Sequence, residues 1–223
     1  MSFFDLILML HVLSGFTALF TFWIPLVTKK GGKAHRRSGW LYTSGMIAVA
    51  ISAVYLSAVR LIDPASSQET VSFSLFLLFI AVLSSSTAYY GIRVLRFKDR
   101  KGIHKQAVDL GFPVLLLFSS IGMSMYGFSQ HVPLLSWFPV LGLFLSASQL
   151  GYWLRPPSQK MHWWFEHFGG MLGCSIATIT AFTVFGAPRL LDIEKVSMLL
   201  WFIPILLLTP VIIGLSIYYR KKF

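Results

Sequence analysis

Seven long apolar stretches constrain the fold of this chain more than any other feature of its sequence. A helix needs about 20 mostly apolar residues to cross the hydrocarbon core of a bilayer. The stretches that reach this length cover approximately residues 3–26, 39–61, 72–95, 107–128, 132–154, 163–185 and 197–218. We therefore predict an all-α fold, a polytopic membrane helical bundle with seven transmembrane helices.

The composition indicates that lipid is the main solvent of this chain. Of its 223 residues, 56% are hydrophobic and only 12% are charged, whereas a water-soluble domain needs more charge to cover its surface. The connections between the apolar stretches are short, so we expect residues 1–223 to form a single transmembrane domain. The first stretch has Asp5 and no basic segment before it, which favours a first span over a cleaved signal peptide.

The basic residues predict an orientation, because basic loops stay on the cytoplasmic side of a membrane. Most of the 19 Lys and Arg residues flank the inner ends of the spans, namely Lys29, Lys30, Lys33, Arg36, Arg37, Arg93, Arg96, Lys98, Arg100, Lys101, Lys105, Arg155, Lys160, Arg220, Lys221 and Lys222. The other side holds Arg60, Arg189 and Lys195 together with Asp5, Asp63, Glu69, Asp192 and Glu194. We predict that the N-terminus is outside and the C-terminus is cytoplasmic.

The formal net charge of +11 follows from this topology. Basic turns at one side of a membrane protein are attracted to anionic lipid headgroups. No basic and aromatic surface remains to bind nucleic acid. The expected partner is therefore the lipid bilayer, including its anionic lipids, and nucleic acid is excluded.

Small residues and prolines predict local features of the spans. Gly169 and Gly173 form a pair of small residues four positions apart, which is typical of close contact between membrane helices. Prolines inside an apolar run remove a backbone donor and tend to kink a span. The seventh stretch carries two of them, Pro204 and Pro210, and is expected to be the most irregular.

Histidines recur at one expected depth of the bundle. His35, His104 and His162 each follow a basic residue and precede an even-numbered span. If the second, fourth and sixth spans are neighbours, these imidazoles converge near the cytoplasmic leaflet. We predict a polar site there, built by these three spans.

Four ionisable residues lie within the predicted spans, where such groups are costly and usually face a bundle interior or a water-filled cavity. They are His11, Asp109, Glu166 and His167. His11 lies toward the outer side, and the other three lie about one turn in from the inner side.

Two cofactors fit these residue types. Haem b needs two imidazoles from different helices at one depth, with basic residues near its propionates, and His35, His104 and His167 are the candidates. Zinc needs nitrogen, oxygen or sulfur ligands, for which His162, Glu166 and Asp109 are further candidates. The single cysteine, Cys174, excludes a cysteine-cluster site and an internal disulfide. Either cofactor predicts a redox or hydrolytic reaction on a small or lipid-soluble substrate.

Other readings of the same residues stay open. A bundle with kinked spans and an isolated Asp109 or His11 suits a transporter of small solutes or ions. A third reading is a non-catalytic membrane scaffold, in which the inner histidines lie among headgroups or bond to helix ends. Interfacial polar residues often do no more than extend toward water.

Short motifs give the chain a family resemblance. HVLSG at His11–Gly15, KGGKAHRRSGWLY at Lys30–Tyr42, WWFEHFGGML at Trp163–Leu172 and TAF at Thr180–Phe182 resemble a large bacterial family of multi-pass membrane proteins, a domain of unknown function. The resemblance spans most of the chain. It implies a protein of the bacterial cytoplasmic (inner) membrane and directs attention to His11, His35 and His167. It carries no activity that transfers to this chain.

Overall fold

The computed structural model describes residues 1–193 and 197–222. Glu194 and Lys195, which the charge count assigned to the outer side, lie outside the described residues, as does the side chain of Lys222. The described chain is helical throughout. Its elements are α1 (Phe3–Thr21), α2 (Trp23–Val27), α3 (Lys33–Ile62), α4 (Gln68–Arg93), η1 (Val94–Arg96), α5 (Ala107–Ser129), α6 (Pro133–Trp137), α7 (Pro139–Leu154), α8 (His162–Ala181), the π-helical turn η2 (Phe182–Gly186), α9 (Ala187–Leu190) and α10 (Leu199–Lys222).

The prediction of seven spans is confirmed. Seven helical segments within the described residues are long and apolar enough to cross a membrane: Phe3–Val27, Lys33–Ile62, Gln68–Arg96, Ala107–Ser129, Pro133–Leu154, His162–Leu190 and Leu199–Lys221. The largest difference from prediction is the start of the second span, because α3 begins at Lys33 and its basic first turns precede the apolar run.

The prediction that the seventh span is the most irregular was wrong. α10 runs as one continuous helix through Pro204 and Pro210, since a proline removes only one backbone hydrogen bond and membrane helices tolerate that loss. The interruptions lie elsewhere. The fifth span breaks at Phe138, where Pro139 begins a new helix, and the sixth contains the π-helical turn η2.

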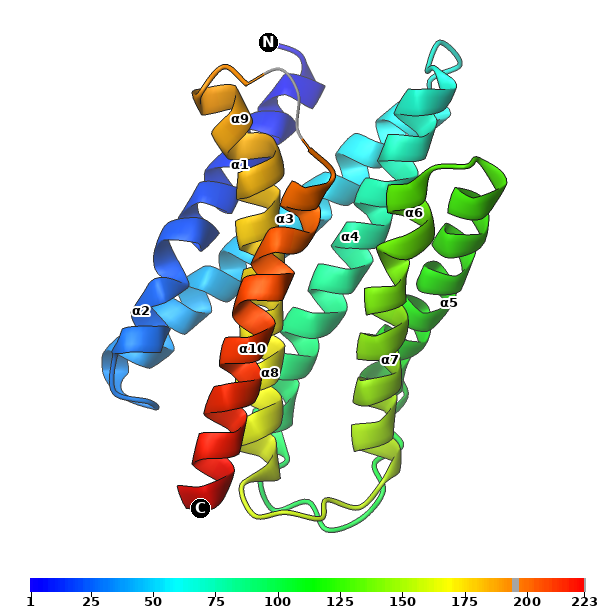
Figure 1. Ribbon diagram of the computed structural model, residues 1–223. Helices are drawn as coiled ribbons and strands as arrows, with labels where there is room; N and C mark the ends of the chain where they lie inside the picture. The colour runs from blue at the N-terminus through cyan, green and yellow to red at the C-terminus, as the bar shows by residue number, and fades with distance from the viewer. Residues whose placement is uncertain (194–196, 223) are drawn as a thin grey trace.

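α4 is the central helix of the bundle (Figure 1). It packs against α3, α5, α7 and α8, while α1 packs on α3, α7 on α5 and α10 on α8. We expected the second, fourth and sixth spans (α3, α5 and α8) to meet at one shared site. Instead, each of them packs on the third span, α4, which lies between them. Residues that were predicted to converge are divided between the two sides of α4.

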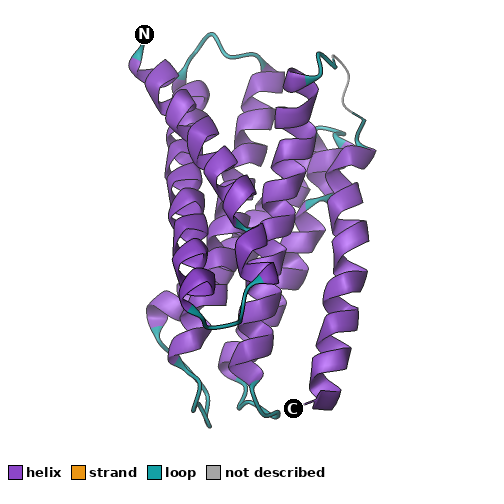
Figure 2. Cartoon of the chain, turned by 90° about the vertical axis from the view of Figure 1, so that its left-hand side faces the viewer, coloured by secondary structure: helices purple, strands orange, loops and turns teal. Residues whose placement is uncertain are grey.

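The turns that hold most of the basic residues lie at one end of the bundle, together with the C-terminus, and the N-terminus lies at the other end (Figures 1 and 2). We call this the basic end. It comprises three turns, at residues 28–32, 97–106 and 155–161.

The middle of the bundle is closely packed with apolar side chains. One cluster lies between α4, α5 and the α6–α7 junction and includes Phe76, Phe79, Leu116 and Phe138, each at most 5% exposed. A second cluster joins α1, α3, α4 and α8 around Tyr42 and Cys174. Cys174 is completely buried.

α4 and α8 make their closest approach through two glycines. A Cβ atom on Gly170 would lie 2.8 Å from the Cα of Gly91, a distance that real side chains do not reach. The expectation that Gly169 and Gly173 form a close helix contact was wrong for Gly169 and right for Gly173, which faces Thr87 of α4. A Cβ on Gly169 would meet nothing within 4 Å, and one on Gly173 would meet only Thr87, at 3.3 Å.

These neighbouring glycines provide a test of the packing. We expect Gly170→Ala to lower the free energy of unfolding by about 1–3 kcal/mol, because the added methyl group overpacks the contact with α4. Gly169→Ala is the matched control and should cost nothing, since its methyl group enters open space. The rate at which a thiol-reactive dye labels Cys174, the only cysteine, measures unfolding in detergent. Equal labelling rates for the two variants would contradict the contact.

Candidate functional site

Asp109 is the most completely enclosed charge at the basic end. It lies in the first turn of α5 with 1% of its surface exposed. Its carboxylate accepts hydrogen bonds from the Tyr89 hydroxyl at 2.6 Å and the Arg93 Nε at 2.7 Å. The His104 Nε2 lies 2.6 Å from the other carboxylate oxygen. Three donors from α4 and the preceding turn thus satisfy this carboxylate, which favours a structural role over binding of a mobile cation.

His104 is held on every side by this part of the fold. Its ring packs against the rings of Phe97 and Trp153, with centroids 4.4 and 4.6 Å away. Its backbone N–H donates to the Trp153 carbonyl at 2.9 Å. Together with the contact to Asp109, these interactions fasten the turn at residues 97–106 to α5 and α7.

Arg100 closes the same turn over the end of α7. Its guanidinium donates to the carbonyl oxygens of Gly102, Tyr152 and Arg155 at 2.8–2.9 Å and lies 4.3 Å from the centre of the Tyr152 ring. Its Nε is buried and has no hydrogen-bond partner among the described residues. Arg100 therefore carries a positive charge into the interior of the basic end.

His35 and His167 meet on the other side of α4. Their ring centroids are 6.3 Å apart. The Nδ1 of His167 lies 2.6 Å from the Gly91 carbonyl oxygen, and the Nδ1 of His35 lies 3.1 Å from that of Pro25. The close approach of α8 to Gly91 is what brings His167 within reach of α4.

Glu166 and His162 face a third region, between α4, α7 and α8. The Tyr90 hydroxyl donates to Glu166 at 2.5 Å, and the Tyr152 hydroxyl lies 2.9 Å from His162 Nδ1. His162 and Glu166 are four residues apart and therefore share one face of α8, and both line one pocket. His11 lies in α1 and belongs to none of these clusters. Its Nδ1 is hydrogen-bonded to the Ser52 Oγ at 2.9 Å.

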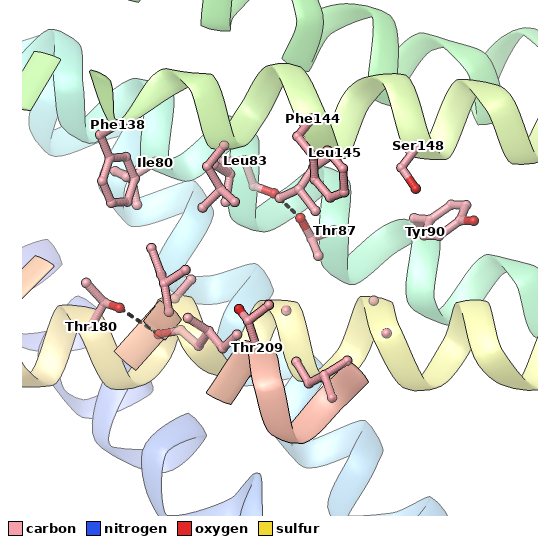
Figure 3. A pocket seen from close by; sticks show the side chains of 18 of the residues that line it. Ile80, Leu83, Thr87, Tyr90, Phe138, Phe144, Leu145, Ser148, Thr180 and Thr209 are labelled. Carbon is pink, nitrogen blue, oxygen red and sulfur yellow. Dashed lines mark hydrogen bonds between the residues drawn. The ribbon is translucent and has the colours of Figure 1, made fainter. Parts of the chain in front are cut away.

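A groove runs along the bundle between α7 on one side and α8 with α10 on the other, with α4 as its floor (Figure 3). Its volume is about 350 Å³ and its walls are mainly aliphatic and aromatic. The hydroxyls of Thr87 and Thr180 donate to carbonyl oxygens of their own helices, at 2.6 and 2.9 Å. They therefore add little polarity to the groove. Gly169 and Gly173 leave the α8 wall open where side chains would otherwise fill it.

A second, polar pocket of about 210 Å³ adjoins the groove at the basic end. It is lined by Arg100, Tyr152, Arg155, Gln159 and His162, with Ser148 and Glu166 at its inner limit. Ser148 and Glu166 also line the apolar groove. Figure 3 shows Ser148 and Tyr90 at one end of the groove and Phe138 and Thr180 at the other. The two spaces therefore adjoin each other at Ser148 and Glu166.

The predicted site residues are divided among three separate clusters. His35 pairs with His167, His104 with Asp109, and Glu166 and His162 lie along the polar pocket. Within residues 1–193 and 197–222, no group of three or more His, Cys, Asp or Glu side chains is placed to hold a metal ion. His35, His104 and His167 therefore do not form the single shared centre that their common depth suggested.

Sequence reasoning missed the residues that organise these clusters. Tyr90, Tyr152 and Gly91 gave no signal, since an isolated tyrosine or glycine in an apolar run is common. Arg93 and Arg100 were counted only as indicators of topology. For Arg93 a usable signal existed, because an arginine at the end of one span and an aspartate at the start of the next favour an ion pair; these two lie 2.7 Å apart.

The fold and these clusters define a polytopic helical membrane protein. Residues 8–105 match the family model described as "Predicted membrane protein (DUF2306)". The matched part includes the motifs at His11–Gly15 and Lys30–Tyr42, whereas Trp163–Leu172 lies beyond it. No curated protein and no solved structure matches the chain.

The enclosed carboxylate of Asp109 provides the second test. We expect Asp109→Asn to lower the free energy of unfolding by about 3 kcal/mol, because it leaves the Arg93 guanidinium without its counter-charge and weakens the acceptor for Tyr89 and His104. Asp99→Asn, on the exposed side of the neighbouring turn, is the matched control and should be neutral. Thermal unfolding in detergent measures both variants. An Asp109→Asn protein as stable as the control would show that the network contributes nothing to the fold.

Proposed function

We propose that this protein binds a single-chain phospholipid that enters its groove sideways from the bilayer. The observation that carries the proposal is that the apolar groove and the polar pocket adjoin at Ser148 and Glu166, which line both. An amphiphile has the same division, an apolar chain joined to a polar head. The combined volume falls in the range of about 300–1,000 Å³ that is typical of small-molecule sites.

The apolar chain of the ligand lies in the groove. Leu83, Phe144 and Leu145 face the space between α7 and α8 (Figure 3), and an apolar chain that fits there gains van der Waals contacts with them. The groove is partly open, and two of its walls come from α7 and α10, helices that lie at the outside of the bundle (Figure 1). A lipid therefore reaches it without leaving the membrane.

The head of the ligand lies in the polar pocket. Arg155 is exposed there, and its side chain has no hydrogen bond or ion pair to the described residues. Arginine binds phosphate oxygens with two parallel N–H donors, and the charge of Arg100 adds to the field. Glu166, at the junction, accepts a hydrogen bond from the glycerol hydroxyl that a phospholipid with one chain leaves free. A lysophospholipid with an anionic head combines all three features.

Other readings have less support in the geometry. A haem or zinc centre shared by His35, His104 and His167 has little support, because Asp109 holds His104. In addition, α4 lies between His104 and the other two histidines. Transport of a solute or ion past Asp109 also has little support, because three donors already occupy its carboxylate.

We further propose that the protein lies in a bacterial cytoplasmic membrane with its N-terminus outside, so that the basic end meets the anionic cytoplasmic leaflet. The excess of Lys and Arg at that end supports this orientation. It also places the polar pocket at the depth of phospholipid headgroups.

Filling the groove should abolish lipid binding without unfolding the protein. Gly169→Leu adds a side chain to the α8 wall, where a Cβ meets nothing within 4 Å. We expect it to reduce retention of lysophosphatidylglycerol at least tenfold, measured by native mass spectrometry of the detergent-solubilised chain. Gly122→Leu, on an exposed part of α5 with equal free space, is the matched control. Equal retention in the two variants would remove the groove as the site.

The head of the ligand is tested at Arg155. We expect Arg155→Gln to weaken lysophosphatidylglycerol roughly tenfold, about 1.4 kcal/mol, and to leave uncharged monoacylglycerol unchanged. Arg189→Gln, at the opposite end of the bundle, is the control. If Arg155→Gln lowers the affinity for both lipids equally, Arg155 does not recognise the anionic head.

Reporter fusions test the orientation. Alkaline phosphatase is active only outside the cytoplasm, and we expect activity when it is fused after Ala65 in the turn between α3 and α4. Green fluorescent protein fused to the C-terminus should fluoresce, because it folds in the cytoplasm. The reverse pattern would overturn the assignment.

A further inference from the structure

His35 and His167 have features of metal ligands that their role as links between helices does not require. They come from two different helices, α3 and α8, and both are partly buried near the basic end. Their ring centroids are 6.3 Å apart with the ring planes inclined at 63°. Neither residue belongs to the lipid groove or to the polar pocket.

Hydrogen bonds fix the same tautomer on both rings. A carbonyl oxygen can only accept, so the Nδ1 of His167 must donate to Gly91 and the Nδ1 of His35 must donate to Pro25. In a neutral imidazole the other nitrogen, Nε2, then carries the free lone pair. Metal-binding histidines show this arrangement, in which one ring nitrogen donates to a carbonyl and the other binds the ion. No described residue forms a hydrogen bond with either Nε2.

The separation of the rings suits one ion between them. A metal–imidazole bond is about 2.0 Å long and each ring adds about 1 Å, so an ion midway between two imidazoles holds their centres about 6 Å apart. The observed 6.3 Å is compatible with this value when both Nε2 atoms face the ion.

The donor set selects the kind of ion. Zinc sites complete a tetrahedron with four ligands and usually include thiolate or carboxylate groups, whereas no third His, Cys, Asp or Glu joins this pair within the described residues. Glu166, next to His167 in sequence, is engaged by Tyr90. Copper(I) is monovalent, accepts two ligands in a line, and binds imidazole. It needs no anionic ligand to balance its charge.

We propose that His35 and His167 bind one copper(I) ion between α3 and α8. The site does not depend on the lipid proposal, since the two sets of residues are separate. Copper then joins α3 to α8 at the basic end, on one side of α4. Its position beside the membrane surface gives it access from the aqueous phase.

The test is an anaerobic titration of the purified full chain with copper(I) in competition with bicinchoninate. We expect one copper(I) per chain and a loss of affinity of roughly 100-fold or more in His35→Ala and in His167→Asn, because loss of a ligand exceeds the 10–100-fold cost of second-shell changes. His167→Asn is used because its amide N–H can still donate to Gly91 and so keeps the helices in place. His131→Ala and His162→Ala are the controls and should bind as the unchanged chain does.

Before each titration is interpreted, slow labelling of the buried Cys174 by a thiol-reactive dye confirms that the variant is folded. X-ray absorption of the copper-loaded chain should show two imidazole nitrogens as ligands. Absence of stoichiometric binding, equal binding in His167→Asn, or a preference of this pair for Zn²⁺ over copper(I) would each overturn the proposal. Loss of stability in the variants with no copper bound to the unchanged chain would leave the two histidines as links between helices only.

Discussion

The contact between the backbones of α4 and α8 at Gly91 and Gly170 determines how the rest of this bundle is arranged. In lipid there is no hydrophobic force between helices, so their association depends on close packing and on polar contacts. The two glycines permit both. They let His167 reach the Gly91 carbonyl at 2.6 Å, and the same register places Glu166 at the Tyr90 hydroxyl. One helix pairing therefore positions the histidine pair on one side and the carboxylate of the groove on the other.

The fold could be predicted from the sequence as far as the number and type of its helices. Hydropathy is a sum over about 20 residues and tolerates local error, so all seven spans were found. The neighbours of each helix were not, because they depend on single residues. The sequence has Gly169, Gly170 and Gly173 together, and only the structure shows that Gly170 makes the closest contact with α4 while Gly169 faces open space. Likewise, Pro139 begins a helix while Pro204 continues one.

The candidate site could be predicted as a location but not as a set of contacts. The basic turns share one end of the bundle, and His35, His104, His162 and His167 all lie toward it. Their partners were out of reach of sequence reasoning. His104 is five residues from Asp109 and binds it, which removes that imidazole from any shared centre. The groove gave no sequence signal at all, because an empty space between helices depends on the absence of side chains from several segments at once.

Under the proposed lipid binding, the groove receives its ligand from the acyl chains of the bilayer and not from water. Its occupancy therefore follows the mole fraction of a lipid in the membrane, which is insensitive to the dilution of the cells or vesicles that carry the protein. A modest intrinsic affinity is then sufficient, since partitioning has already concentrated the ligand around the bundle. A protein that binds a lipid in this way responds to changes in the composition of its own membrane. The surrounding aqueous medium then has little direct influence on which lipid is bound.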